Sequence, residues 1–182
     1  MAARATAVAL LAVLLAFPFR ASPVSPVGEY QLKAAFLYNF ARFIDWPVRG
    51  RANPGDLNLC ILGDSPFGPD IDLINGRTVG QATVRLRRVL IDGVGSCQLL
   101  FIASSESSHL ERDVVRLRGL PILSVGDSTG FSERGIAINF YIEQSKVRFE
   151  INIDAVQRSG LTISSQLLKL ARITHDAVGS HG

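Results

Sequence analysis

The segment QLLFIASSESSHLERDVVRLRGLPILSV, residues 98–125, decides the fold class. Gln98 to Ala103 is a largely apolar run of the kind found in buried strands, and Pro121 to Val125 is a second one. The serine-rich stretch between them offers capping hydroxyl groups, and His109 to Leu117 has helical spacing of its leucines and valine. A strand, a helix and a strand in this order predict two parallel strands joined by a crossover helix.

The same alternation extends toward the N-terminus. Glu29 to Trp46 carries apolar residues at helical spacing and is followed by Pro47, which ends the predicted helix. Strands are predicted at 57–63 and 83–90, with a short helix at 67–75 between them. These elements belong to an α/β domain with a mostly parallel sheet.

The end of the domain follows a different pattern. Residues 136–142 and 147–153 each alternate apolar and polar side chains, and Glu143-Gln-Ser-Lys146 between them reads as a turn. Helices are predicted at 153–158 and 164–173. The predicted fold is therefore a single α/β domain, in which helices flank a central, mostly parallel sheet and the chain ends in an antiparallel β-hairpin and a C-terminal helix.

The first residues resemble a secretory leader. Arg4 precedes an uncharged apolar run from Ala5 to Phe17, which is too short to span a bilayer core of about 30 Å. We predict a signal peptide at 1–21, a flexible N-terminus at 22–28, the domain at 29–173 and a flexible tail at 174–182. A leader that stays attached as a membrane anchor is the alternative, because the usual A-x-A cleavage pattern is absent. The leader predicts export to an oxidising compartment outside the cytoplasm.

Composition narrows the possible functions. Of the 182 residues 47% are hydrophobic and 19% charged, and the mean hydropathy is +0.25, which excludes disorder as the main state. Beyond the predicted leader, the chain has seventeen basic and sixteen acidic residues. Such a near-neutral chain gives no electrostatic reason to expect nucleic acid as a partner.

The two cysteines, Cys60 and Cys97, each adjoin a strongly apolar run. Paired cysteines are common in exported chains, and a bridge is possible if the two runs are neighbouring strands. Two buried free thiols remain the alternative at this point.

Several short motifs resemble those of enzymes. Gly63-Asp64-Ser65 follows a predicted strand, as a hydrolase nucleophile could, and His175 could supply a base. The same tripeptide recurs at 126–128, however, and two copies at strand ends are more simply turns. Phosphate-binding glycine motifs are absent, and His109, His175 and His181 lack the spacing of metal ligands. We therefore expect no catalytic residue, no metal and no cofactor.

Polar side chains of the hairpin are the more interesting candidates. Alternation places Asn139, Tyr141, Arg148, Glu150, Asn152 and Asp154 on the face opposite the apolar one, with Lys146 at the turn. This face is either an ordinary wet sheet surface or a polar shelf for a ligand or partner. The candidate contact residues, which include two from flanking helices, are Arg42, Lys146, Arg148, Glu150 and Arg158.

Seven stretches of the sequence, taken together with their order and spacing, resemble the YfiR-like family of periplasmic proteins. They are EYQLKAAFLYNFARFIDWP, LNLCILGDSPFG, INGRTV, CQLLFIASSE, ILSVGDSTGF, GIAINFYIEQSKVRFEIN and GLTISSQLLKLARI. The resemblance extends from about Glu29 to Ile173. Cys60 and Cys97 match the family's intramolecular disulfide by local context. This chain has no cysteine after Cys97, so it lacks the second disulfide of the type member.

The resemblance implies regulation rather than catalysis. Well-known members are dimeric repressors that bind the periplasmic sensor domain of an inner-membrane diguanylate cyclase, and an OmpA-like outer-membrane lipoprotein can sequester them. Cyclic-di-GMP and biofilm formation rise when the cyclase is released. The expectation is therefore a homodimeric repressor with these two partners. The alternative is a small-ligand-binding domain in which Lys146, Arg148 and Arg158 contact an anion.

Overall fold

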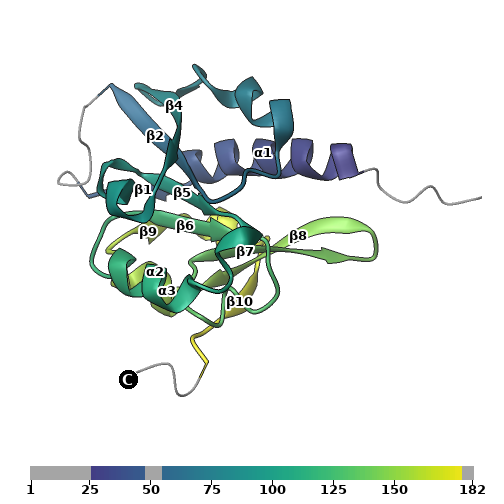
Figure 1. Ribbon diagram of the computed structural model, residues 1–182, viewed down its shortest axis with the longest axis vertical. Helices are drawn as coiled ribbons and strands as arrows, with labels where there is room; N and C mark the ends of the chain where they lie inside the picture. The colour runs from purple at the N-terminus through teal and green to yellow at the C-terminus, as the bar shows by residue number, and fades with distance from the viewer. Residues whose placement is uncertain (1–25, 48–54, 178–182) are drawn as a thin grey trace, which may run out of the picture.

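The fold is built on one eight-stranded sheet, with strand order β10-β8-β7-β6-β5-β2-β4-β3 (Figure 1). The computed structural model describes residues 26–47 and 55–177. Five neighbouring strands run parallel: β4 (Ala82–Val89), β2 (Asp56–Leu62), β5 (Leu99–Ile102), β6 (Leu123–Gly126) and β7 (Ile138–Glu143). Two others pair antiparallel to this group, β3 (Thr78–Val79) with β4 and β8 (Lys146–Asn152) with β7. The predicted single α/β domain with a mostly parallel sheet and an antiparallel hairpin is confirmed.

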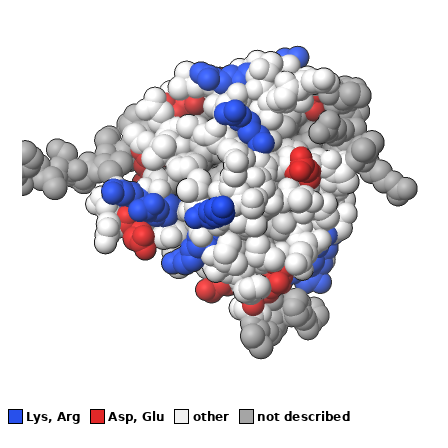
Figure 2. Space-filling model, turned by 180° about the vertical axis from the view of Figure 1, so that it is seen from behind, with Lys and Arg blue, Asp and Glu red and all other residues white. Residues whose placement is uncertain are grey.

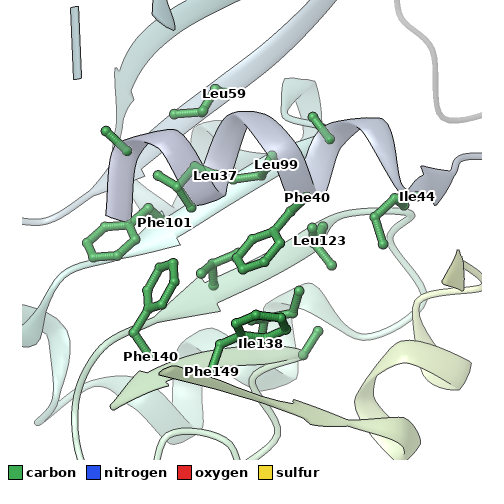
Figure 3. Close-up of a cluster of buried hydrophobic side chains, with 14 of the residues drawn as sticks. Leu37, Phe40, Ile44, Leu59, Leu99, Phe101, Leu123, Ile138, Phe140 and Phe149 are labelled. Carbon is green, nitrogen blue, oxygen red and sulfur yellow. The ribbon is translucent and has the colours of Figure 1, made fainter. Parts of the chain in front are cut away.

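Helix α1 (Pro26–Arg42) covers one face of the sheet. Its side chains Leu37 and Phe40 are fully buried and point toward strand residues such as Leu99, Phe101 and Phe140 (Figure 3). The Phe40 ring lies 5.6 Å from the Phe140 ring, measured between centroids, and 5.0 Å from the Phe149 ring. The helix is therefore fixed against both the parallel strands and the hairpin.

Helix α2 (Leu110–Leu117) lies against the second buried cluster of the molecule. This cluster contains Cys60, Leu62, Leu100 and Leu110, whereas Leu59 and Ile61 of the same strand belong to the α1 side. Strand β2 is apolar on both faces because it is central in the sheet, with β4 and β5 on either side.

Cys60 and Cys97 form a disulfide with a Cα–Cα distance of 5.9 Å. Cys60 lies within β2, and Cys97 lies just before β5, the neighbouring strand. The bridge predicted on the family resemblance is confirmed, and both cysteines are buried.

The hairpin turn has the conformation that strand twist favours. Glu143 pairs with Lys146, and the two residues between them, Gln144 and Ser145, have φ angles of 49° and 59°. A two-residue turn with both φ angles positive matches the right-handed twist of the strands.

The C-terminal helix is shorter than predicted. Within the predicted range 164–173 only α4 (Ser165–Leu168) is helical, and Arg172–Thr174 form strand β10, parallel to β8. The reason is tertiary: β8 offers unpaired backbone groups at Glu150–Asn152, and Ile173 and Thr174 have the β-branched side chains that suit a strand.

The remaining elements connect the sheet. The predicted helix at 67–75 is a 3-10 helix, η2 (Gly68–Ile74), and the first helix ends at Arg42 rather than Trp46. A small antiparallel pair joins the end of α1 to the C-terminal region through β1 (Ile44–Asp45) and β9 (Thr162–Ile163). The others are η3 (Ile91–Ser96), η4 (Ser104–Glu106) and α3 (Ile153–Arg158).

Two predicted segments, the signal peptide and the C-terminal tail, extend beyond the residues that the structure describes. The signal peptide at 1–21 lies outside the described residues. Of the predicted tail at 174–182, Thr174 belongs to β10 and the backbone N–H of Ala177 donates to Glu133, whereas residues 178–182 lie outside the described residues.

Candidate functional site

A cavity of about 370 Å³ lies where β7 continues past the end of β6. Strand β6 pairs with β7 only through Val125 and Gly126, so the edge of β7 from Phe140 onward has no strand neighbour on that side. The loop that follows β6 and the first turns of α1 close the space instead. We call this space the hairpin cavity; its lining residues are Glu29, Lys33, Asp127, Thr129, Gly130, Asn139, Phe140, Tyr141, Ile142, Glu150 and Arg172.

One wall of the hairpin cavity is a buried ion cluster. Lys33 is only 3% exposed, and its ammonium group lies 2.9 Å from Oδ2 of Asp127 and 2.6 Å from Oε1 of Glu29. The hydroxyl group of Tyr30 donates a hydrogen bond of 3.1 Å to the same Asp127 oxygen, and the Lys33 ammonium lies 4.4 Å from the Tyr30 ring centroid. A lysine buried this deeply is tolerated only because it is paired and hydrogen-bonded.

The cluster shifts the pKa of both Lys33 and Tyr30. Burial alone would lower the pKa of Lys33, but the hydrogen bonds to Asp127 and Glu29 outweigh it and raise that pKa above its ordinary value. For Tyr30, burial and the neighbouring Asp127 carboxylate both raise the pKa. Lys33 is therefore charged, and Tyr30 neutral, at physiological pH.

A second ion pair, between Arg172 and Glu150, also lines the cavity. Arg172 of β10 pairs with Oε2 of Glu150, and its guanidinium carbon lies 4.2 Å from the centroid of the Tyr141 ring. Asn139 donates its amide to Oε1 of Glu150 at 3.2 Å and to the backbone of Ser128 at 3.0 Å. The hydrogen bond to Glu150 raises the pKa of Arg172. The cavity lining thus carries charged groups of both signs.

The segment 172–177, which we call the C-terminal strap, is attached mainly through polar contacts. Arg158 makes two contacts with the Asp176 carboxylate, and Asn152 donates to that carboxylate at 2.8 Å. The strap also contacts the domain through the hydroxyl groups of Thr174 and Ser132, and through His175 and Asp154, 3.1 Å apart. Strand β10 is therefore kept at the sheet edge by ion pairs as well as by backbone pairing.

We expect the strap to weaken in acid. Burial opposes ionisation of Asp176, but the hydrogen bonds from Arg158 and Asn152 outweigh it and hold the pKa of Asp176 below its ordinary value of 3.8. A depressed folded-state pKa stabilises the fold above pH 3.8, and this contribution is lost as the pH falls through the folded value. Asp176→Asn should cost about 1 kcal/mol at neutral pH and progressively less below pH 4. Urea denaturation between pH 7 and pH 2 measures this, with Asp92→Asn, an exposed ion-pair residue, as the control. A deficit that does not depend on pH would contradict the role of the ionised carboxylate.

Six partly exposed apolar side chains come from α1, the hairpin and the C-terminal region. We call this set the apolar strip: Leu32, Phe36 and Phe43 of α1 or its end, Ile142 of β7, and Leu170 and Ile173 near β10. The ring centroid of Phe36 lies 5.9 Å from that of Phe140 and 5.6 Å from that of Phe149, so this side of α1 packs against the hairpin. Leu170 is 71% exposed. On the face seen in Figure 2, charged groups are separated by wide uncharged areas.

The sequence-predicted contact residues do not form one site. Glu150 lines the hairpin cavity, but Arg158 is paired with Asp176. Arg148 is on the exposed part of the hairpin, where its Nε lies 4.0 Å from Oε2 of Glu143, and Lys146 is exposed at the turn. Arg42 lines a separate cavity of about 310 Å³ beside Trp46, whose indole donates to the backbone of Gln98.

Half of the predicted polar hairpin face is buried, whereas Tyr141, Arg148 and Asp154 remain at least partly exposed. Asn139, Glu150 and Asn152 are buried, with exposed fractions of 2%, 5% and 0%. The loop after β6 covers Asn139, and the C-terminal strap covers Asn152 through Asp176. These side chains therefore form an internal polar network.

The two Gly-Asp-Ser segments serve the turns at strand ends. Gly63 has a φ of +84°, and a Cβ there would lie 2.4 Å from Oγ of Ser105. A Cβ on Gly126 would lie 2.5 Å from the Phe131 ring. Oγ of Ser65 has no hydrogen-bond partner among the described residues, and His175 is paired with Asp154 instead. The two do not form a nucleophile–base pair.

Sequence reasoning missed Lys33, Asp127, Arg172 and Asp176. A signal existed for Lys33, because it precedes Leu37 by four residues and Phe40 by seven, which places it on the buried side of α1. Asp127 was recognised only as part of a turn. The partners of Arg172 and Asp176 lie more than fifteen residues away in sequence, so local patterns could not reveal them.

Comparison with known families now connects this architecture to relatives. The profile of the YfiR/HmsC-like family matches residues 30–172, which is most of the chain. The chain belongs to this family. YfiR/HmsC-like membership suggests a periplasmic regulator of diguanylate cyclase signalling, with a regulatory rather than a catalytic role. The Cys60–Cys97 bridge of this YfiR-like chain fits an oxidising compartment. No helix within the described ranges is long and apolar enough to cross a membrane.

Two solved structures share the fold at low sequence identity. A conserved domain protein from Vibrio cholerae O1 biovar El Tor N16961 is 10% identical, with a TM-score of 0.54. The ABC domain in complex with L-Trp from Streptococcus pneumoniae is 12% identical, with a TM-score of 0.52. Each match covers 80% of the YfiR-like chain, which spans 60% of the length of the other chain. At these identities the similarity concerns the fold alone.

Proposed function

We propose that this chain is a periplasmic repressor that binds the sensor domain of an inner-membrane diguanylate cyclase and holds the enzyme inactive. Cyclic-di-GMP and biofilm output are low while the complex persists. The observation that carries the proposal is the YfiR/HmsC-like match over residues 30–172. A homodimer, and sequestration by an OmpA-like outer-membrane lipoprotein, are parts of the same proposal.

The apolar strip is the surface we assign to partner contact. Its residues come from α1, the hairpin and the C-terminal region, so a partner seated there would contact three elements at once. Exposed apolar side chains favour protein association, since burying them removes apolar area from water. The charged groups of the hairpin lie beside this strip and would form a polar rim.

Deletion of the gene, with measurement of cyclic-di-GMP, tests the proposed function. We expect the level to rise in the deletion strain and to return when the gene is supplied again. Pull-down of the tagged protein from the periplasm should recover a membrane protein with a diguanylate cyclase domain. An unchanged cyclic-di-GMP level under several growth conditions would contradict the repressor role.

Charge substitutions in the apolar strip test the assigned surface. Leu32→Glu combined with Leu170→Glu should weaken partner binding or dimerisation at least tenfold, because each change places a carboxylate where an apolar contact is buried. Both side chains are substantially exposed, so folding should be preserved. The matched control is Leu90→Glu, which is 82% exposed and lies after β4, near the other edge of the sheet. If the double variant dimerises and represses like the control, the strip is not the interface.

A second function, binding of a small ligand, is favoured by the hairpin cavity. The cavity combines a volume of about 370 Å³ with buried polar side chains of both charges. A ligand held there would contact α1 and the hairpin together, next to the apolar strip. Such a ligand could tune partner binding by preferring one state of the protein.

A further inference from the structure

We propose that the hairpin cavity binds a small organic cation, a primary ammonium group attached to an apolar body. This inference goes beyond the repressor function and does not depend on it, since the isolated chain contains every residue involved. Its basis is the balance of hydrogen-bond donors and acceptors in the cavity lining.

Both cations of the hairpin cavity are already paired with carboxylates of the protein. The Lys33 ammonium contacts Glu29 and Asp127 and lies over the Tyr30 ring. The Asn139 amide nitrogen donates to Ser128 and Glu150, and Arg172 donates twice to Glu150. An anionic ligand would have to compete with carboxylates that already hold both cations.

Acceptors, in contrast, are left over. Oδ1 of Asn139 is buried and has no hydrogen-bond partner among the described residues, although the side chain lines the cavity. Tyr30 and Lys33 both bind Oδ2 of Asp127, and Lys33 binds Oε1 of Glu29, so the second oxygen of each carboxylate receives no hydrogen bond within the described ranges. Oδ1 of Asn139 is closed off, but the second oxygens of Asp127 and Glu29 are accessible, so a ligand N–H group can bind them.

Charge and shape favour the same ligand class. Three carboxylates and two cations line the cavity, so the net charge favours a positively charged guest. Phe140, Tyr141 and Ile142 supply an apolar and aromatic wall. Aromatic faces attract cations as well as apolar groups, and this wall suits the body of an arylalkyl amine.

Three probes of similar size separate the contributions in the purified chain. Benzylamine carries a charge and N–H donors, benzyltrimethylammonium carries the charge without donors, and benzoate carries the opposite charge. We expect saturable benzylamine binding in calorimetry or NMR titration, at least about tenfold tighter than either of the other two. Equal binding of benzyltrimethylammonium, tighter binding of benzoate, or no saturable benzylamine binding up to about 10 mM would overturn the proposal.

A conservative variant locates the site. Glu29 is partly exposed, and Glu29→Gln leaves the contact between Lys33 and Asp127 in place, so the fold should be retained. We expect the variant to weaken benzylamine binding about fivefold to tenfold, and Glu133→Gln, an exposed residue outside the cavity lining, to leave it unchanged. Equal effects of the two substitutions would place the benzylamine elsewhere. Because the titration needs no cyclase, its result is independent of the repressor experiment.

Discussion

Replacing Cys60 and Cys97 together by alanine should lower the free energy of unfolding by about 4 kcal/mol. The bridge closes a loop with a sequence separation of 37 residues, and a cross-link of that length restricts the unfolded chain strongly. Both side chains are also buried in the α2-side cluster, so the smaller alanines lose packing in addition. Urea denaturation of the oxidised wild type and the double variant gives the difference.

Reduction supplies the control for the bridge. A reductant should destabilise the wild type by a similar amount and leave the double alanine variant unchanged, because only the wild type contains a disulfide to break. The reduced wild type should remain somewhat more stable than the variant, since its thiols still fill the cluster. Equal stability of oxidised and reduced wild type would mean that the cross-link does not limit the unfolded chain.

Much of the sheet could be predicted from local patterns, for a physical reason. Central parallel strands are buried on both faces, and the runs LNLCIL and QLLFIA are apolar at nearly every position. The hairpin strands alternate, because α1 covers one of their faces. Strand β10 could not be predicted in this way. Its three residues are a strand because β8 has a free edge beside them, and that edge exists only in the assembled sheet.

The candidate site was less accessible to sequence reasoning. The alternation of the hairpin located Asn139, Glu150 and Asn152 on the correct face, but a period of two says nothing about what covers that face. The covering groups come from the loop after β6 and from the C-terminal strap, both distant in sequence. The sequence left open a wet surface or a polar shelf for a ligand or partner, and in the structure Asn139, Glu150 and Asn152 are buried instead.

Lys33 and Asp127 should be the most costly charged residues to separate. Lys33→Met leaves Asp127 and Glu29 without their shared cation, and we expect a loss of about 3–5 kcal/mol. The cost arises because the side chain of Asp127 is 4% exposed, so an unpaired carboxylate there is poorly hydrated. Asp127→Asn should cost about 3 kcal/mol, because Glu29 still accepts a hydrogen bond from Lys33.

Combining the two substitutions separates pairing from burial. In Lys33→Met/Asp127→Leu no unpaired charge remains between these positions, so the double variant should be more stable than the sum of the single effects predicts, by at least about 1 kcal/mol. The exposed pair of Arg85 and Asp56 is the control, and Asp56→Asn should change stability by less than about 1 kcal/mol. Additive effects at Lys33 and Asp127, each as small as in the control, would mean that water reaches the ion cluster.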